Sequence, residues 1–127
     1  MNSAKKSGNK GEKSVADLLA AKGYRIVRKN FYSRYGEIDI IAEDDKYIVF
    51  VEVKSRSRNS LVGAAEAVDK QKQVKILKTA LTYLAKFDVN KQPRFDVAEV
   101  ELDSSGNVTK VVHLENAFVG DDYDSLF

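Results

Sequence analysis

GEIDIIAEDDKYIVFVEVKSR, residues 36–56, contains the two most strand-like runs of the chain. The first run places Asp39 among isoleucines, and the second places Glu52 and Lys54 among valines and a phenylalanine. A charged side chain inside a buried strand costs free energy unless it is paired or binds an ion. These three residues are therefore the first candidates for a functional site.

Alternation along the two strands decides which of these charged residues can meet. Side chains on a strand point to its two faces in turn, so residues two apart share a face. Glu52 and Lys54 share one face of the second run, and the opposite face carries only apolar residues. Glu37 and Asp39 share one face of the first run. The two charged faces meet if the runs form a hairpin.

The acidic pair DD at residues 44–45 is a turn signal between the two runs. If these two residues form the loop of a hairpin, position 39 pairs with position 50 and position 37 with position 52. Asp39 and Glu52 are then diagonal neighbours on one face, within reach of each other. The pattern thus predicts a cluster of Asp39, Glu52 and Lys54, with Glu37 at its margin.

Carboxylates that lie this close repel each other and lose hydration unless a cation lies between them. The chain has no cysteine and one histidine, which excludes thiolate sites and multi-histidine zinc sites within one chain. We therefore expect Asp39 and Glu52 to bind Mg²⁺ or Mn²⁺. Lys54 would orient an attacking water and offset charge on a phosphorane-like transition state. The alternative is that Glu52 and Lys54 are two exposed side chains of an edge strand.

Hydrophobic periodicity predicts a single α/β domain along the whole chain. We expect helices over about residues 11–22 and 61–87, and strands over 24–32, 37–42, 46–54, 94–102 and 108–116. This order favours a central mixed five-stranded sheet flanked by helices. A length of 127 residues fits one domain. We expect a flexible N-terminus at 1–9, the domain at 10–118 and a loose acidic tail at 119–127.

Composition limits the compartment and the partners. No apolar run approaches the ~20 residues of a membrane helix, and the N-terminus lacks the apolar core of a signal peptide. We expect a cytoplasmic protein with no membrane contact, and the lack of cysteine is compatible with a reducing compartment. The net charge of +2 is too small to indicate nucleic acid by itself.

The spacing of Asp39 and Glu52-Val53-Lys54 resembles the PD-(D/E)XK motif of restriction endonucleases and archaeal Holliday-junction resolvases, with Ile38 in place of the proline. From about residue 8 to 118 the chain resembles the YraN family of small bacterial proteins. The matching segments are GNKGE, GYRIVRKNF, GEIDIIA, VFVEVKSR, AVDKQKQ, RFDV and HLENAF. The resemblance implies a restriction-endonuclease-like fold and a metal-dependent DNA endonuclease, with branched or damaged DNA as a candidate substrate. By analogy with junction resolvases it also implies a homodimer.

The same resemblance implies roles for individual residues. Asp39 and Glu52 would be metal ligands, Lys54 the catalytic lysine, and Glu12 a helix-borne acid beside the metal. The helical spacing of residues 12, 15, 16 and 19 independently puts Glu12 at the edge of the buried helix face. The alternative for Glu12 is a glutamate favoured by the helix dipole in the first turn.

Further basic and polar residues are candidates for nucleic-acid contacts. Arg56 and Arg58 follow the strand that carries Lys54 and are expected to flank the metal site and bind phosphates, together with Arg34. A polar residue at the position of Lys72 or Gln73 assists the site in related nucleases. The alternatives are a solvated helix face for Lys72 and Gln73, and a generic basic surface for the arginines.

Two other functions fit the same residues. One is a non-catalytic nucleic-acid-binding module that retains the nuclease fold. The other is a protein-interaction subunit in which Lys54 simply neutralises Glu52 in a structural ion-pair network. We expect Asp96 and His113 to be structural under each of these functions.

Overall fold

The computed structural model describes residues 3–57 and 68–118, with the backbone alone for residues 3–9. Its elements follow the expected order of one helix, three strands, one helix and two strands. They are α1 (Ser3–Ala21), β1 (Arg25–Ser33), β2 (Gly36–Glu43), β3 (Tyr47–Ser57), α2 (Lys70–Lys86), β4 (Gln92–Leu102) and β5 (Val108–Leu114). The predicted α/β class is confirmed. Neither helix is long and apolar enough to cross a membrane within the described ranges.

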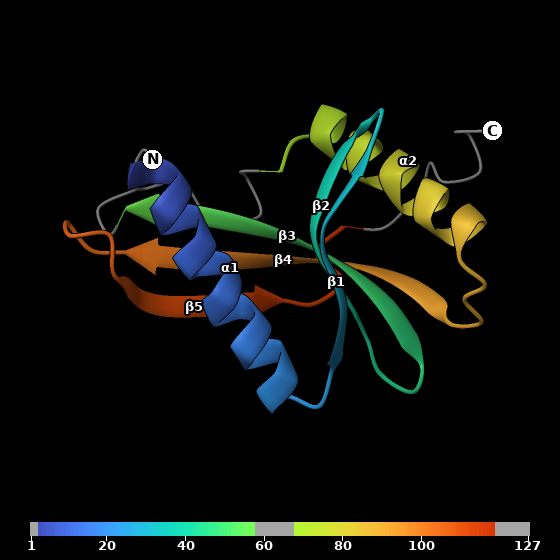
Figure 1. Cartoon of the computed structure of the whole chain (residues 1–127), viewed down its shortest axis with the longest axis horizontal. Coiled ribbons are helices and arrows are strands. Elements are labelled where there is room, and N and C mark those ends of the chain that lie inside the picture. Colours follow the sequence, from blue (N-terminus) through green and yellow to red (C-terminus); the bar gives the residue numbers. More distant parts are fainter. Residues whose placement is uncertain (1–2, 58–67, 119–127) are drawn as a thin grey trace.

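The sheet has the strand order β1-β2-β3-β4-β5 (Figure 1). Neighbouring strands are antiparallel except for β3 and β4, which are parallel. A parallel pair needs a crossover connection, and α2 lies within it. The predicted mixed five-stranded sheet is therefore confirmed, with β3 at its centre.

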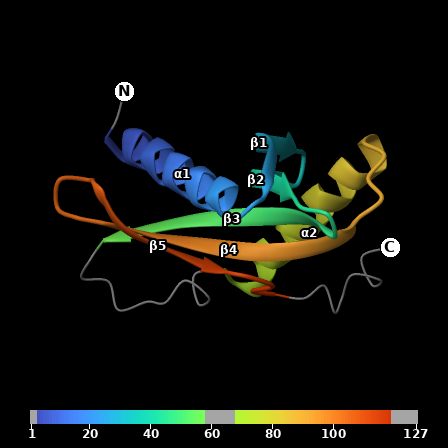
Figure 2. The ribbon, with the colours of Figure 1, turned by 90° about the horizontal axis from the view of Figure 1, so that it is seen from below.

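Each helix covers a different face of the sheet, and Figure 2 shows α1 lying over the layer formed by β3, β4 and β5. Val15 and Leu19 of α1 pack with the fully buried Val51 of β3. On the other face Phe50 of β3 packs with Tyr83 of α2. Burial on both faces explains the nearly continuous apolar run of β3. It also makes any charge on β3 a functional candidate.

Both helices differ from the prediction at their starts. α1 begins at Ser3 rather than near residue 11. α2 begins at Lys70 rather than near residue 61, because Asp69 has an extended backbone and its carboxylate accepts the backbone N–H of Lys72 at 2.8 Å. An aspartate in this position caps a helix N-terminus. Residues 61–67 of the predicted helix, like Arg58 and the tail at 119–127, lie outside the described residues.

The predicted loop of the β2–β3 hairpin was wrong by one residue. The backbone N–H of Asp44 donates to the carbonyl of Tyr47 at 3.1 Å, so the loop consists of Asp45 and Lys46. The carboxylate of Asp44 stabilises this turn by accepting the backbone N–H groups of Lys46 and Tyr47, both at 2.8 Å. Ile41 consequently pairs with Phe50 and not with position 48. The register moves by two residues, which preserves the predicted faces.

Candidate functional site

The site forms where β2 separates from β3. Pairing of the two strands runs from Glu43 to Ile40 of β2 and ends there. At the next residue the Asp39 carboxylate takes the place of a backbone acceptor, and its Oδ2 accepts the N–H of Val53 at 2.7 Å. A buried backbone N–H needs such a partner. The separation therefore brings a carboxylate into the sheet without leaving the backbone of β3 unsatisfied.

A single asparagine on β1 lies at the same level. Its neighbours Lys29 and Phe31 pair with Ile40 and Ile38, and Asn30 itself has a φ of +54°. Asparagine adopts this left-handed conformation more readily than most residues do. With its amide nitrogen turned toward the acids, Asn30 donates to Oε1 of Glu37 at 2.6 Å and to Oε1 of Glu12 at 3.2 Å.

Glu12, Glu37 and Asp39 form a group that we call the carboxylate cluster. One oxygen of each lies within 4.8 Å of an oxygen of the other two. Oxygens bound to one Mg²⁺ at its usual distance are at most about 4.2 Å apart, so small side-chain shifts would let all three bind one ion. The predicted proximity of Glu12 is confirmed. Glu37, expected only at the margin, belongs to the cluster itself.

A cavity of about 250 Å³, which we call the acidic cavity, opens beside this cluster. It is lined by Gly36, Glu37, Asp39, Glu52, Lys72, Lys75 and Ile76. The expected meeting of Asp39 and Glu52 on one side of the hairpin is confirmed by this lining. Side chains of α2 close the cavity opposite the strands, so the two carboxylates face lysines as well as each other.

The electrostatics of the cluster disfavour full ionisation. Burial, followed by the nearby charge of Glu52, raises the pKa of Asp39 to about 8, against the opposing hydrogen bond from Val53. Burial also raises the pKa of Glu12, and the charge of Glu37 adds to that effect. Protons and a divalent cation would therefore compete for the same oxygens.

Glu52 is 6% exposed and differs from the cluster in having lysine partners. Its Oε1 lies 2.6 Å from Nζ of Lys72 and 3.7 Å from Nζ of Lys54. Burial is the largest influence on Lys72 and would lower its pKa, but the hydrogen bonds to Glu52 and Lys54 and the charges of Glu52 and Asp39 together outweigh it, so the pKa is raised. Burial and the proximity of Lys72 lower the pKa of Lys54. The two lysines thus differ in how firmly each holds its proton.

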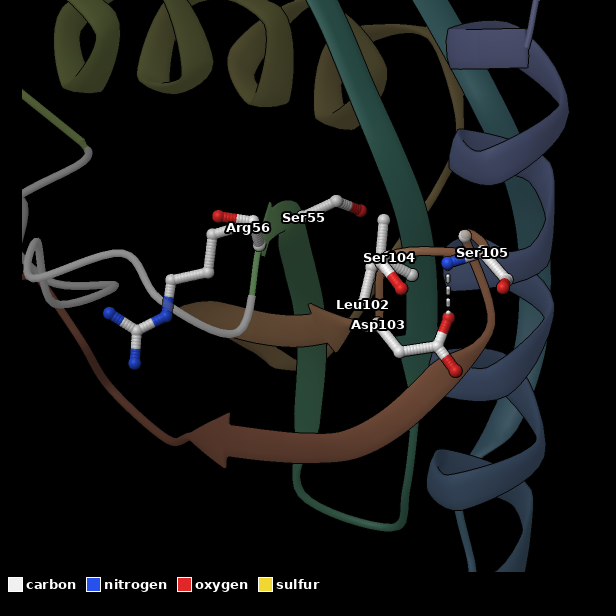
Figure 3. A pocket seen from close by; sticks show the side chains of 8 residues that line it. Ser55, Arg56, Leu102, Asp103, Ser104 and Ser105 are labelled. Carbon is white, nitrogen blue, oxygen red and sulfur yellow. Dashed lines mark hydrogen bonds between the residues drawn. The ribbon is translucent and has the colours of Figure 1, made fainter.

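The other predicted residues lie elsewhere. Arg56 forms an ion pair with Glu99 and does not line the acidic cavity. It lines a second cavity of about 360 Å³ beside the turn at 103–106, and Figure 3 shows its side chain pointing away from Asp103 in that turn. The amide of Gln73 donates to the carbonyl of Val68 at 3.1 Å. Arg56 therefore lines the second cavity and not the acidic cavity, its expected contact with phosphates stays a prediction, and Arg58 is outside the described residues.

Asp96 and His113, expected to be structural, form a buried network with Arg94. The guanidinium of Arg94 donates to both carboxylate oxygens of Asp96, at 2.9 and 2.8 Å. Nε2 of His113 lies 2.7 Å from Oδ2 of Asp96. Neither the acidic cavity nor the second cavity is lined by these residues.

Comparison with known proteins gives a consistent result. The model of a family described as "Uncharacterised protein family UPF0102" matches residues 11–100. A UPF0102 protein of Caldanaerobacter subterraneus is 47% identical over 113 residues, covering 87% of this chain and 93% of the relative. A UPF0102 protein of Clostridium acetobutylicum is 44% identical over 115 residues, covering 90% of this chain and 94% of the relative.

Proposed function

The chain belongs to the uncharacterised protein family UPF0102, and we propose that it is a metal-dependent DNA endonuclease that hydrolyses phosphodiester bonds. The carboxylate cluster carries the proposal. Three carboxylates from α1 and β2 converge within 4.8 Å, and the pKa of Asp39 is raised to about 8 because burial and Glu52 disfavour its charge. A divalent cation would relieve that cost.

Glu12, Glu37 and Asp39 would hold Mg²⁺ or Mn²⁺, since all three offer the oxygen donors that these ions prefer. When bound, such an ion supplies Lewis-acid activation of a phosphodiester and of an attacking water. Glu52 lies in the wall of the same cavity and is a further candidate ligand.

Lys54 and Lys72 would complete the reaction. Lys72, whose pKa is raised, keeps its charge and would bind a phosphate oxygen as negative charge develops on phosphorus. Lys54, whose pKa is lowered by burial, would orient the water and take its proton. The water oxygen forms a new bond to phosphorus, the bond to the leaving nucleotide oxygen breaks, and that oxygen takes up a proton from solvent water.

Sequence resemblance supports the same proposal. Asp39 and Glu52-Val53-Lys54 resemble the PD-(D/E)XK nuclease motif, and the chain resembles the YraN family over most of its length. DNA is accordingly the proposed substrate, and a homodimer, by analogy with junction resolvases, the proposed assembly.

The test is an assay of the purified protein on labelled single-stranded, duplex, flap and four-way-junction DNA with Mg²⁺, Mn²⁺ or EDTA. We expect metal-dependent cleavage that Asp39→Asn and Glu52→Gln reduce by about 100-fold or more. Asp17→Asn is the matched control, because Asp17 is an exposed carboxylate on α1 paired only with Lys13 among the contacts described. Cleavage of none of the four substrates, or equal cleavage by Asp39→Asn, would overturn the proposal.

A non-catalytic nucleic-acid-binding module is the second candidate. It is favoured by the contact of Lys72 with Glu52 at 2.6 Å, because that contact already neutralises one expected metal ligand. This function predicts DNA binding that is unchanged in Asp39→Asn and no binding of Mn²⁺ by calorimetry. The endonuclease predicts Mn²⁺ binding that Asp39→Asn removes.

A further inference from the structure

A second surface, which we call the basic groove, lies beside the acidic cavity. It encloses about 580 Å³ and is lined by Arg34, Tyr35, Gln71, Val74, Lys75 and Lys78. The last four residues have helical i, i+3, i+4 and i+7 spacing and form one face of α2. The first two belong to the turn between β1 and β2. Three of the six residues are cations and none is acidic.

The basic groove adjoins the acidic cavity, because Lys75 lines both. Lys72, Lys75 and Lys78 recur every third residue along α2. Each interval corresponds to a rise of about 4.5 Å, so the three lysines extend over about 9 Å of the helix axis. One strand of DNA carries a charge about every 3.4 Å of its axis. The lysine row therefore extends over a few consecutive phosphates of one strand.

Two of the three cations of the groove lie against an aromatic ring. The guanidinium of Arg34 lies 4.9 Å and the ammonium of Lys78 5.3 Å from the centroid of the Tyr35 ring. Nη2 of Arg34 also donates to the hydroxyl of Tyr35 at 2.6 Å. Cations that are already restrained lose less conformational freedom when they bind phosphates.

The two walls of the groove are joined by a pair of hydroxyl groups. Ser33, at the end of β1, lies 2.8 Å from the hydroxyl of Thr79 on α2. The same Thr79 hydroxyl donates to the carbonyl of Lys75 at 2.8 Å. These hydrogen bonds join the end of β1 to α2 beside the groove.

We propose that the basic groove binds the DNA strand whose scissile phosphate lies in the acidic cavity, holding the next few phosphates on one side of it. The regular lysine spacing favours a polyanion with evenly spaced charges. The location of the scissile phosphate rests on the proposed function. The binding of strand phosphates by Arg34 and Lys78 is independent of the proposed function.

The experiment measures binding of a labelled single-stranded DNA by fluorescence anisotropy in EDTA at several salt concentrations. The double variant Arg34→Gln/Lys78→Gln removes two cations that line the basic groove and do not line the acidic cavity. We expect affinity to fall about 10-fold or more at low salt, and the slope of log K against log salt to become shallower by about 1.4. Lys86→Gln is the control, because Lys86 is on α2 but does not line the groove. Thermal unfolding checks that each variant is folded.

Unchanged affinity and salt slope in the double variant would overturn the inference, and tighter binding of an RNA of the same sequence would overturn DNA as the occupant. Failure of the inference differs from failure of the proposed function. Loss of DNA binding in the double variant of a protein that never cleaves would support the groove and refute the endonuclease. Full cleavage and unchanged DNA binding by the double variant would support the endonuclease and refute the groove as the DNA-binding surface.

Discussion

Nζ of Lys72 lies 2.6 Å from Oε1 of Glu52, so a helix-borne lysine holds the carboxylate that the sequence assigns to a metal ion. Lys54, the lysine of the strand motif, is farther from the same oxygen, at 3.7 Å. Lys72 is 40% exposed and Glu52 6%, so the ion pair lies at the wall of the cavity rather than in its interior. The pair can therefore open toward a ligand more cheaply than a fully buried one.

Removal of Lys72 should strengthen metal binding and weaken turnover. In Lys72→Met the positive charge beside the carboxylates is lost, and we expect Mn²⁺ affinity to rise about fivefold, which corresponds to about 1 kcal/mol. Cleavage should fall, because Lys72 would no longer bind the phosphate. Calorimetric Mn²⁺ titration and the cleavage assay measure the two effects. Weaker Mn²⁺ binding in Lys72→Met than in a Lys86→Met control would contradict this role.

The metal-free protein should lose stability as the pH rises from about 5 to 8. Asp39 has a folded-state pKa of about 8 against 3.8 for the ordinary carboxyl. A raised pKa means that the folded state binds the proton more tightly than the unfolded state does. Protonation of Asp39 therefore contributes fully to the free energy of unfolding below pH ~4, and this contribution is lost as the pH rises through the folded-state pKa. One such proton gives a slope of at most about 1.4 kcal/mol per pH unit. Urea unfolding in EDTA at pH 5, 6.5 and 8 measures it.

Asp39→Asn provides the control for this pH dependence. The amide cannot ionise, so the free energy of unfolding should depend less steeply on pH. The pH dependence that remains would come from Glu12, whose pKa is also raised. Mn²⁺ should stabilise the wild type more at pH 8 than at pH 6, because the metal competes with the proton. Equal slopes for the wild type and Asp39→Asn would exclude a buried, proton-binding Asp39.

The Arg94–Asp96 pair should matter for stability and not for metal binding. Asp96 is fully buried, and although burial alone would raise its pKa, the hydrogen bonds from His113 and Arg94 lower it. Asp96→Ala leaves the guanidinium of Arg94 without its carboxylate, which costs about 3–5 kcal/mol. His113→Gln disrupts the hydrogen bonds of the imidazole with Asp96 and Lys22, of which only the one with Asp96 is buried, and should cost about 1 kcal/mol. Urea unfolding measures both, and a change in Mn²⁺ affinity in His113→Gln would contradict a purely structural network.

The fold could be predicted from the sequence because the alternation of side chains in strands and the helical spacing of apolar residues remain recognisable even when the ends of an element are assigned wrongly. The hairpin loop was assigned one residue early, since both Asp44 and Asp45 are turn residues and the sequence does not say whose carboxylate accepts the backbone N–H groups. That error moved the register by two residues, and a shift of two keeps every side chain on its face. The start of α2 was missed because capping by Asp69 competes with a helical pattern that extends upstream of it.

Residues of the candidate site could be predicted only where the periodic pattern of a single strand or a single helix places them. Asp39 and Glu52 follow from strand alternation, and Glu12 from helical spacing. The contact of Lys72 with Glu52 could not be derived, because it depends on where α2 lies against the sheet. The central place of Glu37 likewise depends on the separation of β2 from β3. No local pattern in the sequence predicts that separation.

Asn30 offers a last prediction, because its backbone and its side chain have separable roles. Its φ of +54° favours glycine or asparagine, and its amide joins Glu37 to Glu12. Asn30→Gly keeps the conformation and loses the amide, so stability should change little while Mn²⁺ affinity falls. Asn30→Ala loses both and should be less stable than Asn30→Gly by about 1 kcal/mol. Asn30→Asp adds a fourth carboxylate, which should destabilise the protein in EDTA and strengthen Mn²⁺ binding. Urea unfolding with and without Mn²⁺ measures all three variants. If Asn30→Asp were as stable as the wild type in EDTA and bound Mn²⁺ no better, the carboxylates beside Asn30 would not form a cation site.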